Sequence, residues 1–254
     1  AIDYGVFDSV AVPIGGLSVQ AVWNRLIPDA AALARLRGCA AKAPPHSSAY
    51  SPASSHGAAC PPDLAGLAGL AAGVPASGAE RPVAEMLDAV NRGANHFIRY
   101  GSDAEIHGSP DHWASIDEIL KLRRGDCEDY AIAKLWVLAA LGIPLEQMQM
   151  VVLLDTRRHL YHAVLVVHAG GARYVLDNTT DSLRADRAAT DYLPLYSLSA
   201  RNAYVHGFTI VDRTRMSGLK PIGEVYPGLG AEMPADGANG DDIAGTAQDI
   251  GLYL

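Results

Sequence analysis

The chain has 254 residues, of which 49% are hydrophobic and 19% charged, and its formal net charge is −8. This composition is typical of a globular protein, and the length allows a substantial core without metals or disulfides. Six acids and no basic residue follow Lys220, so 22 of the 28 acids stand in the rest of the chain with all 20 basic residues. That near-neutral body excludes nucleic acid as the main partner, because phosphate binding needs a basic surface.

The sequence predicts no membrane span, since it contains no run of about 20 apolar residues. The chain begins at Ala1 rather than Met, and we expect a processed or trimmed chain. Three parts are predicted: an extended N-terminal arm over 1–25, a folded domain over 26–215, and an acidic Gly/Pro-rich tail over 216–254. We expect the tail to be poorly ordered or to drape over the surface.

The first elements surround a pair of cysteines. The arm is expected to end in a helix near 22–36, and Cys39 and Cys60 flank a loop rich in Pro, Ser and Ala. A bridge between them would require an oxidising compartment and would be worth about 3 kcal/mol in the chain-entropy model. The alternative is two unpaired small residues.

Further helices are predicted over 79–100 and 115–122, and the best-defined one follows Gly125-Asp126. In it Ile132, Leu135, Trp136 and Ala139 recur at helical spacing, and Gly142 with a following proline ends it. Cys127 therefore lies at or beside a helix N-terminus. Strands are predicted over 148–154, 161–167 and 172–176.

Cys127 is a candidate nucleophile, because a helix N-terminus is one of the few places that lower the pKa of a cysteine. A buried, inert cysteine at a helix start is the alternative. The hairpin that follows in the sequence supports the catalytic interpretation of Cys127.

Gly170-Gly171 suits a two-residue hairpin turn, in which Ala169 pairs with Ala172. In that register His162 and Asp177 project from one face as diagonal neighbours, within reach of a histidine side chain. A thiol, an imidazole and an orienting carboxylate form a nucleophile–base–acid set. A slip of one residue would separate them, and His168 on the same face is the alternative base.

Three acids, Asp126, Glu128 and Asp129, crowd the candidate nucleophile, and their charges should disfavour a thiolate. They could cap the helix and point away from the sulfur. Alternatively they could bind calcium, which prefers clustered carboxylate oxygens.

Several segments together resemble the bacterial transglutaminase-like cysteine peptidases: VNRGANHFIRYGSDAEIHG, DHWASIDEIL, RRGDCEDYAIAKLWVLAALGIP, YHAVLVV and RYVLDNTTDSL. The likeness spans about residues 85–200, and GDCEDYAIAK is its most specific block. It implies a papain-like α+β fold, with helices on an antiparallel sheet and a Cys-His-Asp triad that maps onto Cys127, His162 and Asp177. It also implies calcium at the acids beside the nucleophile, here Asp126 and Glu128, with Asp129 as a further candidate.

The resemblance implies a periplasmic or otherwise exported peptidase with a protein substrate, a cell-surface adhesin in biofilm biology. It also implies a membrane-anchored regulatory receptor as a possible partner. A transglutaminase, acyltransferase or amidase with the same triad is the alternative enzyme. A binding module that kept the fold without catalysis is the alternative outside enzymes.

Overall fold

The computed structural model describes residues 2–40, 66–67, 70, 83–207 and 220–229. The helices are α1 Ser18–Leu26, α2 Ala30–Ala40, α4 Val83–Phe97, α5 Asp103–Ile106, α6 Ile116–Leu122 and α7 Cys127–Ala140, with short 3₁₀ turns η1 Leu145–Gln147, η2 Asp186–Ala188 and η4 Ile222–Glu224. The strands are β1 Val10–Ile14, β2 Arg99–Tyr100, β3 Arg124–Gly125, β4 Met148–Asp155, β5 Leu160–Ala169, β6 Ala172–Leu176, β7 Arg184–Ala185, β8 Tyr192–Ser199 and β9 Asn202–Gly207.

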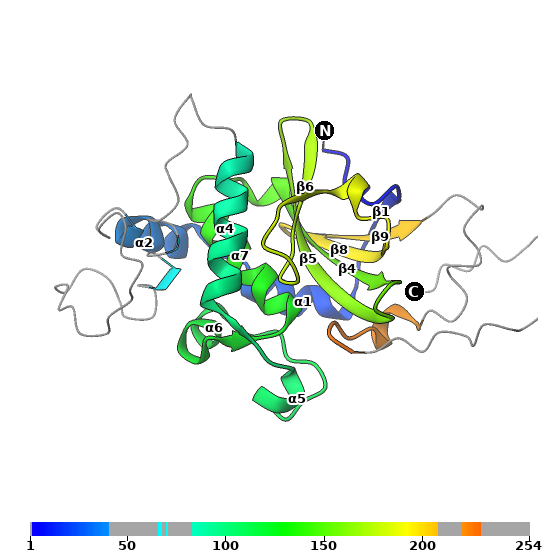
Figure 1. Ribbon diagram of the computed structural model, residues 1–254, viewed down its shortest axis with the longest axis horizontal. Helices are drawn as coiled ribbons and strands as arrows, with labels where there is room; N and C mark the ends of the chain where they lie inside the picture. The colour runs from blue at the N-terminus through cyan, green and yellow to red at the C-terminus, as the bar shows by residue number, and fades with distance from the viewer. Residues whose placement is uncertain (1, 41–65, 68–69, 71–82, 208–219, 230–254) are drawn as a thin grey trace, which may run out of the picture.

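Within these ranges, seven strands form one sheet in the order β1-β9-β8-β4-β5-β6-β7, and all its pairings are antiparallel. Helices α7, α4 and α2 stand on one side of this sheet (Figure 1). The protein therefore has the predicted α+β class, with a helical layer packed on an antiparallel sheet.

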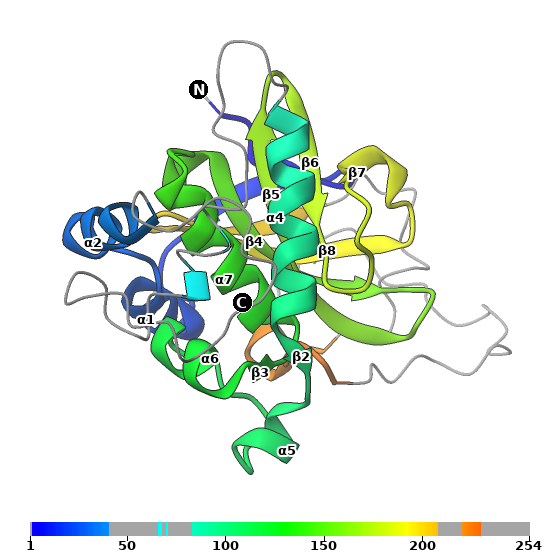
Figure 2. The ribbon, with the colours of Figure 1, turned by 60° about the vertical axis from the view of Figure 1, so that its left-hand side comes forward.

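The centre of the fold is α7, in which every residue from Cys127 to Ala139 is buried. It packs on β5 and β4, and α4, α2 and α6 pack around it. A helix that is covered on all sides must be apolar all round, as this one largely is. Figure 2 shows α4 alongside α7 and the small β2–β3 pair below them.

The β5–β6 hairpin has the predicted register. Ala169 pairs with Ala172 across the two-glycine turn, and the ladder continues to Leu165 opposite Leu176. Both turn glycines have positive φ, 59° and 80°, which explains why glycine stands at each. The predicted alternation of side chains along both strands is therefore the observed one.

The expected helix near 22–36 is wrong in one respect, because two helices, α1 and α2, occupy this region. Pro28 between them lacks the N–H that a continuous helix needs. Asp29 then caps α2, since its carboxylate accepts a hydrogen bond from Ala32 N–H at 2.7 Å. Before them, β1 pairs along β9 as the outer strand of the sheet.

Strand β8 was not predicted, because Pro194 stands in its middle and proline cannot donate to a ladder. The register with β4 shifts between Val152, opposite Tyr196, and Leu153, opposite Pro194. This irregularity accommodates the proline inside a fully buried strand.

Part of the predicted tail is described, and it packs on the fold through a buried residue. Residues 220–229 are described, and Val225 belongs to the main hydrophobic core. Cys39 is buried and disulfide-bonded. Cys60, its predicted partner, lies outside the described residues.

Candidate active site

Cys127 is the first residue of α7, and the β2–β3 pair fixes the chain that leads to it. Tyr100 pairs with Gly125, two residues before the cysteine. A Cβ at position 125 would overlap the side chain of Asp129, so only glycine fits there. The sulfur is therefore held by backbone pairing on one side and by a buried helix on the other.

The surroundings of the thiol raise its pKa. Cys127 is 2% exposed. Burial is the largest cause of the raised pKa, and the nearby charges of Glu128 and Asp126 add to it. The thiol donates to Glu128 Oε2 at 3.2 Å, while the backbone N–H of Ala163 hydrogen-bonds the sulfur and opposes the shift. The cysteine thus lies against β5 at Ala163, the residue that follows His162.

His162 and Asp177 are in contact. His162 Nε2 lies 3.0 Å from Asp177 Oδ1, and both side chains are buried. An ionised carboxylate can only accept, so Nε2 carries the hydrogen and Nδ1 is left as the basic nitrogen. This arrangement fixes both the tautomer and the orientation of the imidazole.

Asp177 is satisfied on both oxygens. Oδ1 also accepts from Thr179 N–H and Thr179 Oγ1, both at 2.9 Å, and Oδ2 accepts from Tyr192 Oη at 2.5 Å and Arg184 Nη2 at 3.1 Å. Burial alone would raise the pKa of Asp177, but the hydrogen bond from His162 and the other donors hold it well below its usual range. The carboxylate therefore stays ionised.

Helix α4 holds the loop that follows Asp177. The amide of Asn95 donates to the carbonyls of Asp177 and Thr180 at 3.0 and 3.1 Å. Asn91, fully buried one turn earlier, donates to Thr180 and Asp181. These amides fix the end of β6, from which the carboxylate projects.

A cluster of acids lies on the other side of the thiol. Asp126 and Glu128 are buried, and so is Asp103, the first residue of α5. Three carboxylate oxygens have no hydrogen-bond partner: Asp126 Oδ1, Glu128 Oε1 and Asp103 Oδ1. Burial, with further contributions from neighbouring charges, raises the pKa of Asp126 to about 7 and that of Glu128 well above its usual value. Buried, unpartnered acid oxygens are costly unless something binds them.

Asp129 differs from the other acids of the cluster. Its Oδ1 accepts from Ala114 N–H at 3.0 Å and its Oδ2 from Asp126 N–H at 3.3 Å. One oxygen therefore accepts from the backbone just before α6 and the other from the backbone at the start of α7. Asp129 still lies within 4.8 Å of Asp103 and Asp126, and Asp111 joins the cluster in the same way beside Asp103 and Glu128.

The sequence did not predict the further residues of the acid cluster or the donors around Asp177. Asp103 and Asp111 stand in the polar turn region before α6, where two acids eight positions apart were the available signal. Tyr192, Arg184 and Thr179 gave no comparable signal. His168 is not brought to this site, since its Nε2 lies 3.1 Å from Gln149 Nε2 near the far end of β5.

None of the helices within the described ranges combines the length and apolar character needed to cross a bilayer.

The model of the family described as bacterial transglutaminase-like cysteine proteinase BTLCP matches residues 71–207. No curated protein sequence matches the chain. Among solved structures, Legionella pneumophila LapG is similar, with 27% identity, a TM-score of 0.48, and 56% of this chain and 77% of that chain covered.

Two further structures of the same Legionella pneumophila protein are similar. The EGTA-treated form has 27% identity, a TM-score of 0.48 and coverage of 56% and 75% of the two chains. The calcium-bound form has 26% identity, a TM-score of 0.49 and coverage of 59% and 82%. Because the family model spans more than half of the chain and includes the thiol, the imidazole and the carboxylate described above, the chain belongs to the bacterial transglutaminase-like cysteine proteinases and is a cysteine peptidase.

Proposed function

We propose that the protein is an endopeptidase in which Cys127 is the nucleophile, His162 the general base and acid, and Asp177 the residue that orients the imidazole. The contact that carries this proposal is His162 Nε2 to Asp177 Oδ1 at 3.0 Å, beside a cysteine at a helix start. A base held by an ionised carboxylate, next to a thiol that it can deprotonate, is the arrangement that acyl transfer requires.

The proposed reaction has two halves. His162 Nδ1 takes the thiol proton, and the sulfur attacks the peptide carbonyl carbon. The developing oxyanion is stabilised at the N-terminus of α7, where the backbone N–H of Cys127 is a donor. His162 then gives its proton to the leaving amine, which departs and leaves a thioester. Water, deprotonated by His162, hydrolyses the thioester and restores the thiol.

We propose that the acid cluster holds calcium, through Asp126 and Glu128 with Asp103 and Asp111, and with Asp129 as the weakest candidate. The fit rests on three unpartnered, buried carboxylate oxygens, because calcium takes six to eight oxygen ligands. When bound, the ion would supply positive charge beside the thiol. Glu128, whose Oε2 accepts a hydrogen bond from the thiol at 3.2 Å, would link the proposed metal site to the nucleophile.

The substrate is proposed to be a cell-surface protein, such as an adhesin, cut in the periplasm or another exported compartment. The disulfide at Cys39 supports an oxidising compartment, since cytosolic proteins rarely keep such bonds. A membrane-anchored receptor is proposed as the regulator. Capture of proteins on a Cys127→Ala variant, followed by mass spectrometry, would identify both partners.

The decisive experiment compares wild type with Cys127→Ala on a protein substrate in calcium. We expect the variant to lose cleavage entirely while its circular dichroism and melting temperature are retained. Product masses that include one added water show hydrolysis, whereas conjugation to an added amine shows transfer. Normal turnover by Cys127→Ala would refute the proposed nucleophile.

A further inference from the structure

The edge of β5 beside the thiol is left open by the sheet. Strand β6 pairs with β5 only from Ala169 to Leu165, and it then ends. Strand β5 continues to Leu160 with β4 on its other side. Ala163 N–H, just past the end of β6, reaches the sulfur of Cys127. The next backbone groups that point the same way, two residues further along, belong to Tyr161.

The chain's own C-terminal segment occupies this edge at Tyr161. Tyr161 N–H donates to the carbonyl of Leu229 at 2.9 Å, and Gly228 N–H donates to the carbonyl of Tyr161 at 2.8 Å. Two residues thus oppose one, with a glycine at φ 83° in the first position, which is the pattern of a β-bulge. Residues 228–229 therefore occupy the backbone hydrogen-bonding groups of Tyr161 on β5 beyond the end of β6.

The same segment reaches across to the start of α7. A Cβ at Gly228 would lie 3.3 Å from Asp126 Oδ2 and 3.8 Å from the hydroxyl of Tyr100. The segment therefore spans from the neighbour of His162 to the neighbour of Cys127. Both catalytic candidates are 2% exposed in this arrangement.

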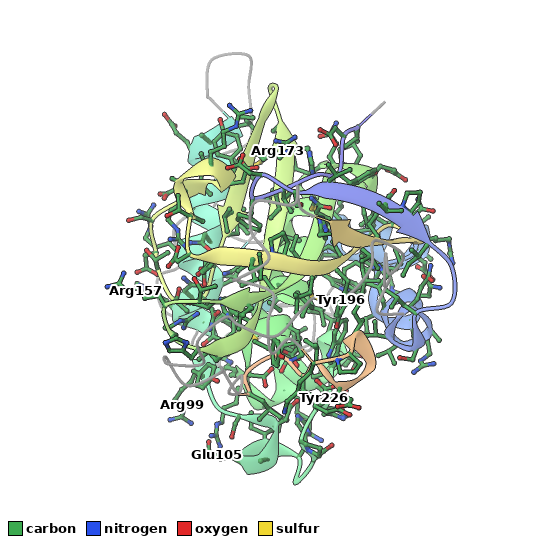
Figure 3. The ribbon with its side chains drawn as sticks, turned by 90° about the vertical axis from the view of Figure 1, so that its right-hand side faces the viewer. Arg99, Glu105, Arg157, Arg173, Tyr196 and Tyr226 are labelled. Carbon is green, nitrogen blue, oxygen red and sulfur yellow. The ribbon has the colours of Figure 1, made fainter. Side chains whose placement is uncertain are left out.

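The segment combines buried and exposed residues, and Pro227 is buried as well as Val225. Val225 is 4% exposed and packs in the main core, whereas Tyr226 and Leu229 are 37% and 40% exposed. Figure 3 labels Tyr226 on this segment, drawn in orange. A short piece that is anchored by two buried residues, Val225 and Pro227, and paired with Tyr161 through two backbone hydrogen bonds can open at lower cost than global unfolding.

We propose that residues 226–229 occupy the peptide-docking edge of β5 as an autoinhibitory segment, and that a protein substrate displaces them. Substrate would then add as an extended strand through the N–H and C=O of Tyr161, which places its next residues beside the thiol. This inference rests on the proposed function, because it names the edge at which that substrate binds.

The test uses the full chain and measures alkylation of Cys127 by iodoacetamide. Gly228→Val places a branched side chain against Asp126 at a positive φ, and Val225→Asp removes one of the two buried anchors. We expect each to raise the alkylation rate at least about tenfold by favouring local opening. Gly223→Val is the matched control, because a Cβ there meets nothing within 4 Å, and its rate should equal that of wild type.

Hydrogen exchange gives a second readout. The amide of Tyr161 should exchange faster in both opening variants, because its acceptor on Leu229 is lost. Unchanged alkylation and unchanged exchange at Tyr161 in folded Gly228→Val and Val225→Asp would overturn the proposal. Neither readout uses a substrate, so failure of the peptidase proposal alone would leave both measurements able to support the segment's role.

Discussion

Asp177 and the acids at the start of α7 are all buried carboxylates, but they differ in how their charge is satisfied. Asp177 accepts from His162, Thr179, Tyr192 and Arg184, and its pKa is lowered. The acids at the start of α7 leave Asp126 Oδ1 and Glu128 Oε1 without a partner, and their pKa values are raised.

Asp177 is therefore a carboxylate with a fixed position and compensated charge, which we call the anchor. The acids at the start of α7 form a site that lacks a compensating positive charge. A carboxylate with every oxygen satisfied is stable as an anion and can hold an imidazole in one orientation. A group of like charges with unpartnered oxygens is stable only when protonated or bound to a cation. Asp177 therefore fits an orienting role, and the cluster fits a divalent cation.

The largest expected effect comes from removing the anion at the anchor. In Asp177→Asn, we expect kcat/KM to fall by about 10³–10⁴-fold, because a neutral amide neither fixes the His162 tautomer nor stabilises its charged form. Steady-state kinetics on a peptide substrate measures this. Asp181→Asn makes the same change on an exposed acid of the same loop and should retain activity. Equal activities would show that Asp177 does not orient the base.

The same variant tests the lowered pKa through stability. The folded pKa of Asp177 lies below its unfolded value, so the unfolded state binds more protons as pH falls below about 4. The stability contributed by Asp177 is thus present at neutral pH and is lost in acid. Urea titrations should show the gap between wild type and Asp177→Asn shrinking from pH 7 to pH 3. A gap independent of pH would contradict the lowered pKa.

Calcium provides the test of the unsatisfied cluster. At a calcium concentration 100 times the Kd, we expect wild type to gain about 2.7 kcal/mol of unfolding free energy relative to chelator. Asp126→Asn with Glu128→Gln should lose that gain, and in chelator should melt above wild type because like charges are removed. Thermal melts with calcium or chelator measure both effects.

Asp117→Asn is the control for this experiment, since it neutralises an exposed acid of α6. It should respond to calcium as wild type does. Identical melting of wild type with and without calcium would refute the metal site.

The smallest expected effect is loss of one donor to the anchor. Tyr192→Phe removes the hydroxyl that donates to Asp177 Oδ2 and leaves Arg184 in place. We expect a loss of about 1.5–3 kcal/mol in stability, as for a hydrogen bond to a charged group, with a modest fall in activity. Tyr174→Phe, at a half-buried position on β6, is the control and should change stability less. Equal losses of stability in the two variants would show that the Tyr192 hydroxyl does not stabilise the Asp177 carboxylate.

The local pattern of the sequence predicted the parts of the site whose geometry is short-range. The turn glycines at 170 and 171 set the register, and the register puts His162 and Asp177 on one face. The helix after Gly125-Asp126 follows from its apolar spacing and stop signals. Strands β8 and β9 were not predicted. In β8, Pro194 lies within the strand, and a proline normally argues against a central strand.

The sequence by itself determined the hairpin register, the helix start at Cys127 and the excess of acid beside it, because each depends on neighbours within a few positions. Only the tertiary structure decided which acids meet. Asp103 and Asp111 join Glu128, Tyr192 and Arg184 close on Asp177, and residues 228–229 reach Tyr161. These contacts join segments far apart in the chain, and packing of the helices on the sheet brings them together.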